Sequence, residues 1–289
     1  MKVKITADST CDLSEELIRR YDIAIAPLTV SLGERSGKDG VDITPEDIYA
    51  YVDRMGSLPK SSAISVWEYT ELFQHWRNEG YEIVHVCISS QFSSTFQNAT
   101  LAAAEVGGAW VVDSKNLSTG QGHVALYAAE LAAKGAGAAE IAAACNEHTD
   151  RVEASFVVNT IDYLYKGGRC SALAALGANI LQIKPCINVV NGRMVPGKKY
   201  TGSIDRVIRS YVKDRLQDRL DIEQSRIFIT HTYCEPKTIE TVKTLVREYC
   251  PNMQEILETD AGATVTTHCG PGTLGVLFIR KAALQKEEC

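Results

Sequence analysis

Short apolar runs alternate with amphipathic segments through the first half of the chain. Apolar runs of about four to eight residues are typical of buried strands, and apolar positions spaced by three and four predict helices. The expected strands are 3–7, 23–30, 83–88, 110–112 and 155–158. The expected helices are 13–21, 45–55, 66–79, 95–106 and 120–134. This alternation predicts a parallel sheet, whose ligand crevice lies beyond the carboxyl ends of its strands.

Two of these helices carry clear start signals. Thr44 places a capping hydroxyl before Pro45, which suits the first helical position. Ser65 and Glu68 have the spacing of a capping box. The alanine- and glycine-rich segment 135–144 is expected to be a joint between helices and not a linker.

The pattern changes near residue 160. Asn191-Gly192, the strongest two-residue hairpin signal, separates apolar runs at 184–190 and 193–195. Helices at 203–220 and 236–249 then alternate with strands at 227–230, 255–258 and 275–279. The sequence therefore predicts an α/β protein of two domains. Residues 1–160 form a parallel-sheet, Rossmann-like domain, and residues 161–289 form a mixed α+β domain, with a ligand between them.

Composition excludes several classes of protein. The chain has no apolar run of about eighteen residues, so no membrane-spanning segment is predicted. Its first residues enter a strand pattern without a signal-peptide block, which favours a cytoplasmic location. Nine cysteines without a Cys-x-x-Cys pair are expected to be reduced thiols, and no metal site is predicted. A net charge of −6 argues against nucleic-acid binding.

Polar side chains gather where the expected strands end. Segment 89–95 contains four serines and a threonine, follows strand 83–88 and opens a helix, and segments 8–12 and 113–114 follow other strands. Ser61 and Ser62 lie in the loop before the helix that Ser65 begins. Hydroxyl donors near a helix start suit a carboxylate. Each cluster alone is typical of a helix cap, but together they predict a polar crevice at one sheet edge.

Two glycine-containing segments bring charged or titratable side chains toward this crevice. His268 comes just before the glycine-rich run 270–275, so we expect it on a tight turn, facing either a ligand or solvent. Gly167 and Gly168 permit a sharp turn beside Arg169, whose guanidinium suits a carboxylate. The apolar segment 172–181 is suited equally to the wall of a cavity and to plain core.

These segments together resemble the DegV family of bacterial fatty-acid-binding proteins, and the resemblance covers essentially the whole chain. Each matching segment alone is only modestly specific for the family, whereas the order and spacing of the segments together are strongly specific. The matching pieces are residues 6–13, 89–99, 111–115, 162–171, 183–185 and 268–276.

The resemblance implies a two-domain DegV fold that buries one long-chain fatty acid in a tunnel and uses no cofactor. It implies a protein without catalytic activity, which presents the fatty-acid carboxylate to a separate dihydroxyacetone-kinase-like fatty-acid kinase. The resulting acyl phosphate would enter phospholipid synthesis. By position, the carboxylate contacts are Ser61, Ser93, the Ser94 backbone N–H and His268, and Arg169 is a supporting charge.

Three positions depart from the family pattern. Ser61 stands where threonine is usual, and Ala63-Ile64 replace a usual Gln-Pro pair in the loop over the head group. Segment 197–203 replaces a more basic stretch that is typical of members that dock the kinase. These departures bear on the lid over the head group and on the kinase partnership.

Two other functions compete with lipid binding. A hydrolase or acyltransferase would use Ser93 as nucleophile and His268 as base, although no third member that would orient His268 is evident in the sequence. A DNA-binding regulator is disfavoured by the acidic charge and by the lack of a recognition-helix pattern.

Overall fold

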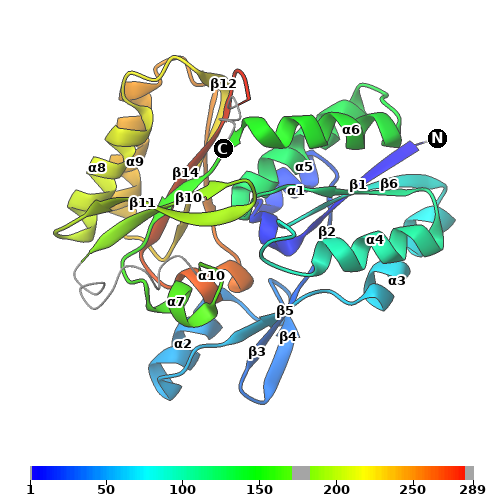
Figure 1. The fold of residues 1–289 in the computed structure, drawn as a ribbon, viewed down its shortest axis with the longest axis horizontal. Coiled ribbons are helices and arrows are strands. Elements are labelled where there is room, and N and C mark those ends of the chain that lie inside the picture. Colours follow the sequence, from blue (N-terminus) through cyan, green and yellow to red (C-terminus); the bar gives the residue numbers. More distant parts are fainter. Residues whose placement is uncertain (1, 171–182, 284–289) are drawn as a thin grey trace.

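The computed structural model describes residues 2–170 and 183–283. Two β-sheets lie side by side, each covered by helices, and a smaller third sheet lies below them in the view of Figure 1. One large sheet is parallel and the other is mixed, which confirms the predicted fold class.

The parallel sheet has the strand order β2-β1-β6-β7. Its strands are β1 (Lys2–Asp8), β2 (Ala24–Ala26), β6 (Tyr81–Cys87) and β7 (Ala109–Asp113). Helices α3 (Val66–Asn78) and α4 (Thr95–Val106) pack on one face. The other face is covered by α1 (Glu15–Arg20), α5 (Ser118–Ala133) and α6 (Ala138–His148). The 3-10 turn η1 (Ser9–Cys11) follows β1.

The seven-stranded sheet has the order β11-β10-β9-β14-β12-β13, and β8 pairs with β14. In this sheet, β12 and β13 form the one parallel pair among the described strands. The strands are β8 (Val152–Glu153), β9 (Ser155–Val157), β10 (Lys184–Val190), β11 (Arg193–Tyr200), β12 (Ile222–Thr232), β13 (Glu255–Asp260) and β14 (Thr273–Arg280). Helices α8 (Ile204–Leu216) and α9 (Pro236–Tyr249) cover one face.

One predicted strand, 23–30, is two strands in the structure. Pro27 separates β2 from β3 (Thr29–Leu32), because proline has no N–H to continue a ladder. The chain leaves the parallel sheet there and enters a small antiparallel sheet of β3, β4 (Arg35–Lys38) and β5 (Lys60–Ser62). Helix α2 (Pro45–Met55) packs beside this sheet.

The local signals in the sequence act as predicted. Thr44 and Ser65 both form capping boxes, at the starts of α2 and α3. Asn191 and Gly192, both at positive φ, join β10 to β11 as a hairpin. Strand β11 runs to Tyr200, five residues beyond the predicted end.

Three helices lie where the sequence predicted none, the short α7 (Asp162–Gly167) among them. Helix α6 occupies most of the alanine- and glycine-rich segment and begins after Gly137, so this segment is more than a joint. Helix α10 (Ala263–Cys269) contains His268, which is therefore not on a turn. The threonine-rich sequence of α10 concealed it, because β-branched residues favour strands over helices. The remaining helical segment is η2 (Thr149–Arg151).

Helix α5 lies between the two large sheets. Most of its side chains are buried around its whole circumference, as expected of a helix covered on all sides. The Nε2–H of His123 donates to the Leu277 carbonyl in β14 at 3.2 Å, and Gln121 donates to the Val86 carbonyl in β6. Both sheets therefore share this helix as part of their core.

The mixed sheet contains strands from both sides of residue 160. Strands β8 and β9 precede that residue, yet they pair with β14 and β10 of the mixed sheet. The division into residues 1–160 and 161–289 stays a prediction.

Candidate functional site

A cavity lies where α10, β5 and the loop between β6 and α4 meet. Four of the five predicted contact residues line it: Ser61, Ser93, Arg169 and His268. Its other described lining residues are mostly apolar. They are Thr10, Leu28, Ser62, Ala63, Ile88, Phe92, Leu117, Met194, Thr264, Val265 and Cys269.

Ser61 and His268 form a pair at this cavity, although 207 positions separate them in the chain. Ser61 lies on β5, and its Oγ is 2.7 Å from Nε2 of His268. Helix α10 ends at Gly270, whose φ is 69° and whose backbone packs against Tyr163. This glycine conformation stops the helix directly after His268 and Cys269, which fixes the imidazole at the cavity wall.

The imidazole of His268 is neutral at neutral pH. Burial, followed in size by the charge of Arg169, lowers its pKa to about 4. Nδ1 has no hydrogen-bond partner among the described residues. It faces Gly167, where an added Cβ would lie 2.8 Å from Nδ1. Gly167 therefore provides the space that the ring occupies.

Ser93 and Ser94 lie at the start of α4 but differ in their exposure to the cavity. Ser93 Oγ accepts a weak hydrogen bond from the Thr95 N–H at 3.3 Å, which leaves the Ser93 hydroxyl proton free. Ser94 is the exposed N-cap residue of α4, and it is not among the described residues that line the cavity. The predicted contact through its backbone N–H stays a prediction.

Arg169 lies at the rim of the cavity. It follows the left-handed Gly168 that ends α7, and its Nη1 donates to the Gly167 carbonyl at 2.7 Å. Its side chain is exposed. The apolar segment 172–181, suited equally to a cavity wall and to plain core, lies outside the described residues.

Two carboxylates bind the backbone at the start of α10, an arrangement that no local pattern in the sequence predicted. Asp12 accepts from the Gly262 N–H at 2.9 Å, and Asp39 accepts from the Ala263 N–H at 2.8 Å. Burial raises the pKa of Asp12 to about 8. Asp12 follows β1, so part of the polar segment 8–12 positions the helix that carries His268.

A second, more apolar cavity continues from the first. The two share Leu117, Val265 and Cys269 in their walls. The second cavity is lined by residues of the mixed sheet and of the start of α5, including Phe156, Leu277 and Ser118. The polar groups of Ser61 and His268 thus line the first cavity, and the second cavity adjoins it on the side of the mixed sheet.

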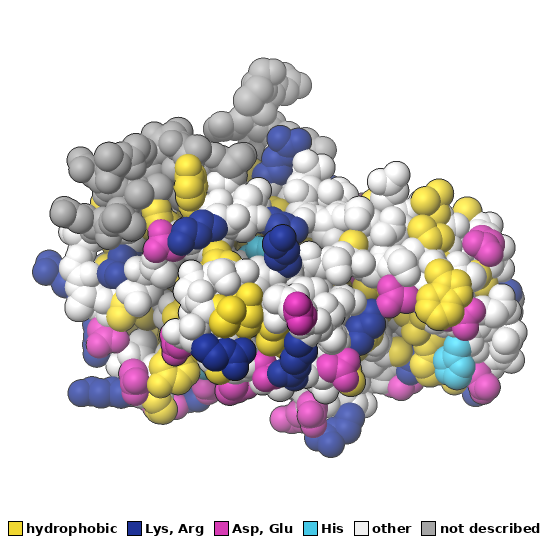
Figure 2. Space-filling model, turned by 90° about the horizontal axis from the view of Figure 1, so that it is seen from below, with side chains coloured by type: hydrophobic (Ala, Val, Ile, Leu, Met, Phe, Trp, Pro, Cys, Tyr) yellow, Lys and Arg dark blue, Asp and Glu magenta, His cyan; other side chains and the backbone are white. Residues whose placement is uncertain are grey.

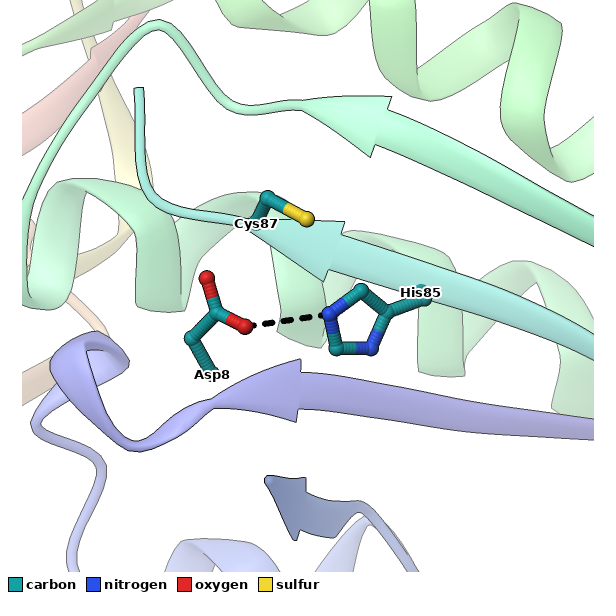
Figure 3. A group of neighbouring side chains, drawn as sticks. All are labelled: Asp8, His85 and Cys87. Carbon is teal, nitrogen blue, oxygen red and sulfur yellow. Dashed lines mark hydrogen bonds and ion pairs between the residues drawn. The ribbon is translucent and has the colours of Figure 1, made fainter. Parts of the chain in front are cut away.

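Beside this site, Asp8, His85 and Cys87 form a buried cluster (Figure 3). In the described part of the chain this is the one group of three or more His, Cys, Asp or Glu side chains whose donor atoms all lie within 4.8 Å of one another. Asp8 accepts from His85 Nε2, the Tyr69 hydroxyl and the Ile88 N–H, at 3.0, 2.5 and 2.9 Å.

Hydrogen bonds also occupy the other atoms of the cluster. His85 Nδ1 lies 2.7 Å from the Thr6 hydroxyl. Burial raises the pKa of the Cys87 thiol, which disfavours the thiolate that a metal requires. The geometry is therefore that of a structural network, and through Ile88 it fixes the start of the loop that carries Ser93.

The end of the molecule with α2, α7 and the small sheet is shown in Figure 2. Lysine and arginine side chains lie near the middle of this face, with acidic side chains interspersed. Such a mixture differs from the continuous basic surface of nucleic-acid-binding proteins. Within the described ranges, no helix combines the length and the apolar character that crossing a membrane requires.

A family model described as an uncharacterised protein of the DegV family matches residues 2–281. The chain belongs to the DegV family. A DegV relative from Thermotoga maritima, named a fatty acid-binding protein, is 32% identical over 282 residues, which cover 95% of this chain and 96% of the relative.

Solved DegV structures have the same fold. A DegV lipid-binding protein from Thermotoga maritima has a TM-score of 0.85 at 30% identity, covering 98% of this chain and 100% of that one. DegV from Bacillus subtilis, described as a fatty acid-binding protein, has a TM-score of 0.84 at 27% identity, covering 97% of this chain and 100% of that one.

Proposed function

We propose that this DegV protein binds a long-chain fatty acid, with the carboxylate at Ser61, Ser93 and His268 and the acyl chain between the two sheets. The observation that carries the proposal is the Ser61–His268 pair at the wall of a largely apolar cavity, which a second apolar cavity adjoins. The names of the relatives from Thermotoga maritima and Bacillus subtilis support the same ligand class.

Proton positions at the site suit a carboxylate. With the proton of neutral His268 on Nε2, the imidazole donates to Ser61 Oγ, and the Ser61 hydroxyl donates onward. Ser93 Oγ already accepts from the Thr95 N–H, so its hydroxyl proton is free to donate to the carboxylate. Two hydroxyl donors and the nearby Arg169 satisfy a negative group that would otherwise be costly to bury.

The acyl chain supplies most of the binding free energy. Burial is worth about 0.8 kcal/mol per methylene, or roughly 11 kcal/mol before association costs for a sixteen-carbon acid. The two cavities hold only about 50 and 30 Å³ of free space, so the chain displaces side chains as it enters. Met194 and Phe92 line the first cavity, and the flexible Met194 is suited to such movement.

The proposal extends to presentation of the bound carboxylate to a partner fatty-acid kinase for phospholipid synthesis. The rim position of Arg169, next to the head-group end of the cavity, supports a carboxylate that a partner reaches from outside. In this proposal the protein binds the lipid, and the partner performs the phosphorylation.

A serine hydrolase or acyltransferase built on Ser93 and His268 is not favoured by the geometry. His268 Nε2 pairs with Ser61, whereas a catalytic base would contact its nucleophile. No described carboxylate bonds to His268 Nδ1, so the group that orients the base in a triad is missing from the described residues.

Native mass spectrometry of the purified protein, followed by organic extraction, tests the proposal. We expect a stoichiometric adduct with the mass of a long-chain fatty acid. Protein that carries no lipid and takes up neither palmitate nor oleate would rule the proposal out.

Ser93→Ala tests the head-group contacts, and Ser94→Ala is its matched control. Loss of the Ser93 hydroxyl should weaken palmitate binding about ten- to hundredfold, since a hydrogen bond to a charged group is worth about 1.5–3 kcal/mol. Ser94→Ala keeps the backbone N–H and removes a side chain that makes no capping hydrogen bond, so binding should be unchanged. Equal affinity in all three proteins would contradict the contact at Ser93.

A further inference from the structure

Three threonines on the short helix α10 differ in how their hydroxyl groups are used. Thr266 Oγ1 donates to the Ala261 carbonyl at 3.2 Å, and Thr267 Oγ1 donates to the Ala263 carbonyl at 2.8 Å. Thr264 Oγ1 has no hydrogen-bond partner among residues 2–170 and 183–283. Its hydroxyl is the one on this helix that the described structure leaves unused.

The free hydroxyl of Thr264 is buried at the wall of the head-group cavity. The residue is 4% exposed, and it lines the cavity together with His268. Residues four apart lie on the same face of a helix, with Cβ atoms about 5–6 Å apart. Thr264 is therefore one helical turn from His268 along the same wall.

A buried hydroxyl without a partner destabilises a folded protein. Because the Thr264 hydroxyl lies beside a cavity, a donor or acceptor of a ligand within that cavity would satisfy it. We infer that Thr264 is a further ligand-binding residue, whose hydroxyl bonds to an oxygen of the lipid near its head group. The inference rests on the proposed function and adds a third hydroxyl to those of Ser61 and Ser93.

Two lipid oxygens have the chemistry to fill this role. One is the second oxygen of the carboxylate, which accepts from the Thr264 hydroxyl. The other is a hydroxyl on the first carbons of the acyl chain, as in a 3-hydroxy fatty acid, which both donates and accepts. Unlike Ser61 and Ser93, Thr264 Oγ1 has no described hydrogen-bond partner. Its hydroxyl is therefore free to donate a hydrogen bond, to accept one, or to do both.

Thr264→Val tests the inference, because valine keeps the branched shape of threonine and replaces its hydroxyl with a methyl group of similar size. Thr267→Val is the matched control on the same helix, where the hydroxyl bonds to the backbone and does not line the cavity. Dissociation constants for palmitate and 3-hydroxypalmitate are measured for both variants and the unchanged protein, together with the thermal stability of the lipid-free forms.

If the carboxylate is the partner, Thr264→Val weakens binding of both acids about tenfold. If a chain hydroxyl is the partner, palmitate binding is unchanged and a preference for 3-hydroxypalmitate disappears. In both cases the lipid-free Thr264→Val protein is at least as stable as the unchanged one, because an unsatisfied group has been removed.

Thr264→Val protein that binds both acids as the unchanged protein does would overturn the inference. Loss of binding in Thr267→Val of the same size would also overturn it, since the effect would then belong to the helix and not to one hydroxyl. If the unchanged protein binds neither acid, the proposed function fails instead.

Discussion

Two buried polar clusters lie at the carboxyl ends of β1 and β6, and they use their hydrogen bonds differently. Around Asp8, each carboxylate oxygen and each nitrogen of His85 has a partner within the protein. Around His268, Nδ1 and the Thr264 hydroxyl have none among the described residues. The first cluster is closed on itself, and the second borders a cavity.

The difference separates structure from binding. A saturated network stabilises the chain but has no group left for a ligand, whereas a free hydroxyl beside a largely apolar cavity, such as that of Thr264, can bond to a ligand. Asp8 and His85 have the residue types of an active site, yet their role is to fix the loop toward Ser93.

The largest effect is expected from Asp8→Ala in the saturated cluster. It leaves His85, the Tyr69 hydroxyl and the Ile88 N–H without their acceptor in the core. Removal of the shared acceptor from a buried hydrogen-bond network that leaves three donors unpaired costs about 3–5 kcal/mol of unfolding free energy. Urea denaturation measures the loss, and Asp8→Asn, which retains an acceptor oxygen, should lose less. A loss below about 1 kcal/mol would show that this network does not stabilise the fold.

His148 gives a third case for this comparison of buried polar groups. Its ring nitrogens lack hydrogen-bond partners among the described residues, but it borders none of the cavities described above. Its ring is stacked on Tyr127 at 4.0 Å. Burial, followed by the charge of Arg151, lowers its pKa to about 4. The unfolded chain therefore binds a proton near pH 6.5, before the folded protein does, and stability falls as the pH drops from there toward 4.

His148→Phe removes this titration and keeps an aromatic ring on Tyr127. Between pH 6.5 and 4 the variant should lose about 2–3 kcal/mol less unfolding free energy than the unchanged protein. Denaturation curves across this pH range measure the difference, and palmitate affinity at pH 7 should be the same in both. Parallel pH profiles would show that His148 is not held neutral by the fold.

A smaller effect, confined to binding, is expected from Gly167→Ala. The new methyl group would lie 2.8 Å from His268 Nδ1, so the imidazole must move away from Ser61. Palmitate should bind about tenfold more weakly, while unfolding free energy changes by less than about 0.5 kcal/mol. Gly137→Ala, where a Cβ meets open space, is the control. Unchanged binding by Gly167→Ala would mean that the position of the ring is not critical.

Sequence patterns were enough to predict the elements built from local signals. Proline at the first helical position and a clear apolar period predicted α2 and α9 at their observed bounds. The resemblance to the DegV family implied Ser61, Ser93 and His268 as contacts of one carboxylate, and these three residues line one cavity, although their role there stays a prediction. Periodicity, caps and turns are all read within a few residues, which is why the bounds of α2 and α9 were predicted correctly.

The features that escaped prediction depend on contacts between distant parts of the chain. Asp12 meets the N–H of Gly262 across 250 positions, and no local pattern indicates that contact. Helix α10 is held at its start by such contacts, which override the strand preference of its threonines. The free hydroxyl of Thr264 is visible only once its neighbours on the helix have been accounted for.

The position of helix α5 between the two sheets has a consequence for how the protein unfolds. Its apolar surface is shared by the parallel sheet on one side and the mixed sheet on the other. Neither sheet would retain a complete core if the other melted, so we expect the two halves of the chain to unfold in one cooperative transition. The expected thermodynamic unit is thus the whole described molecule, wherever a boundary is drawn along its sequence.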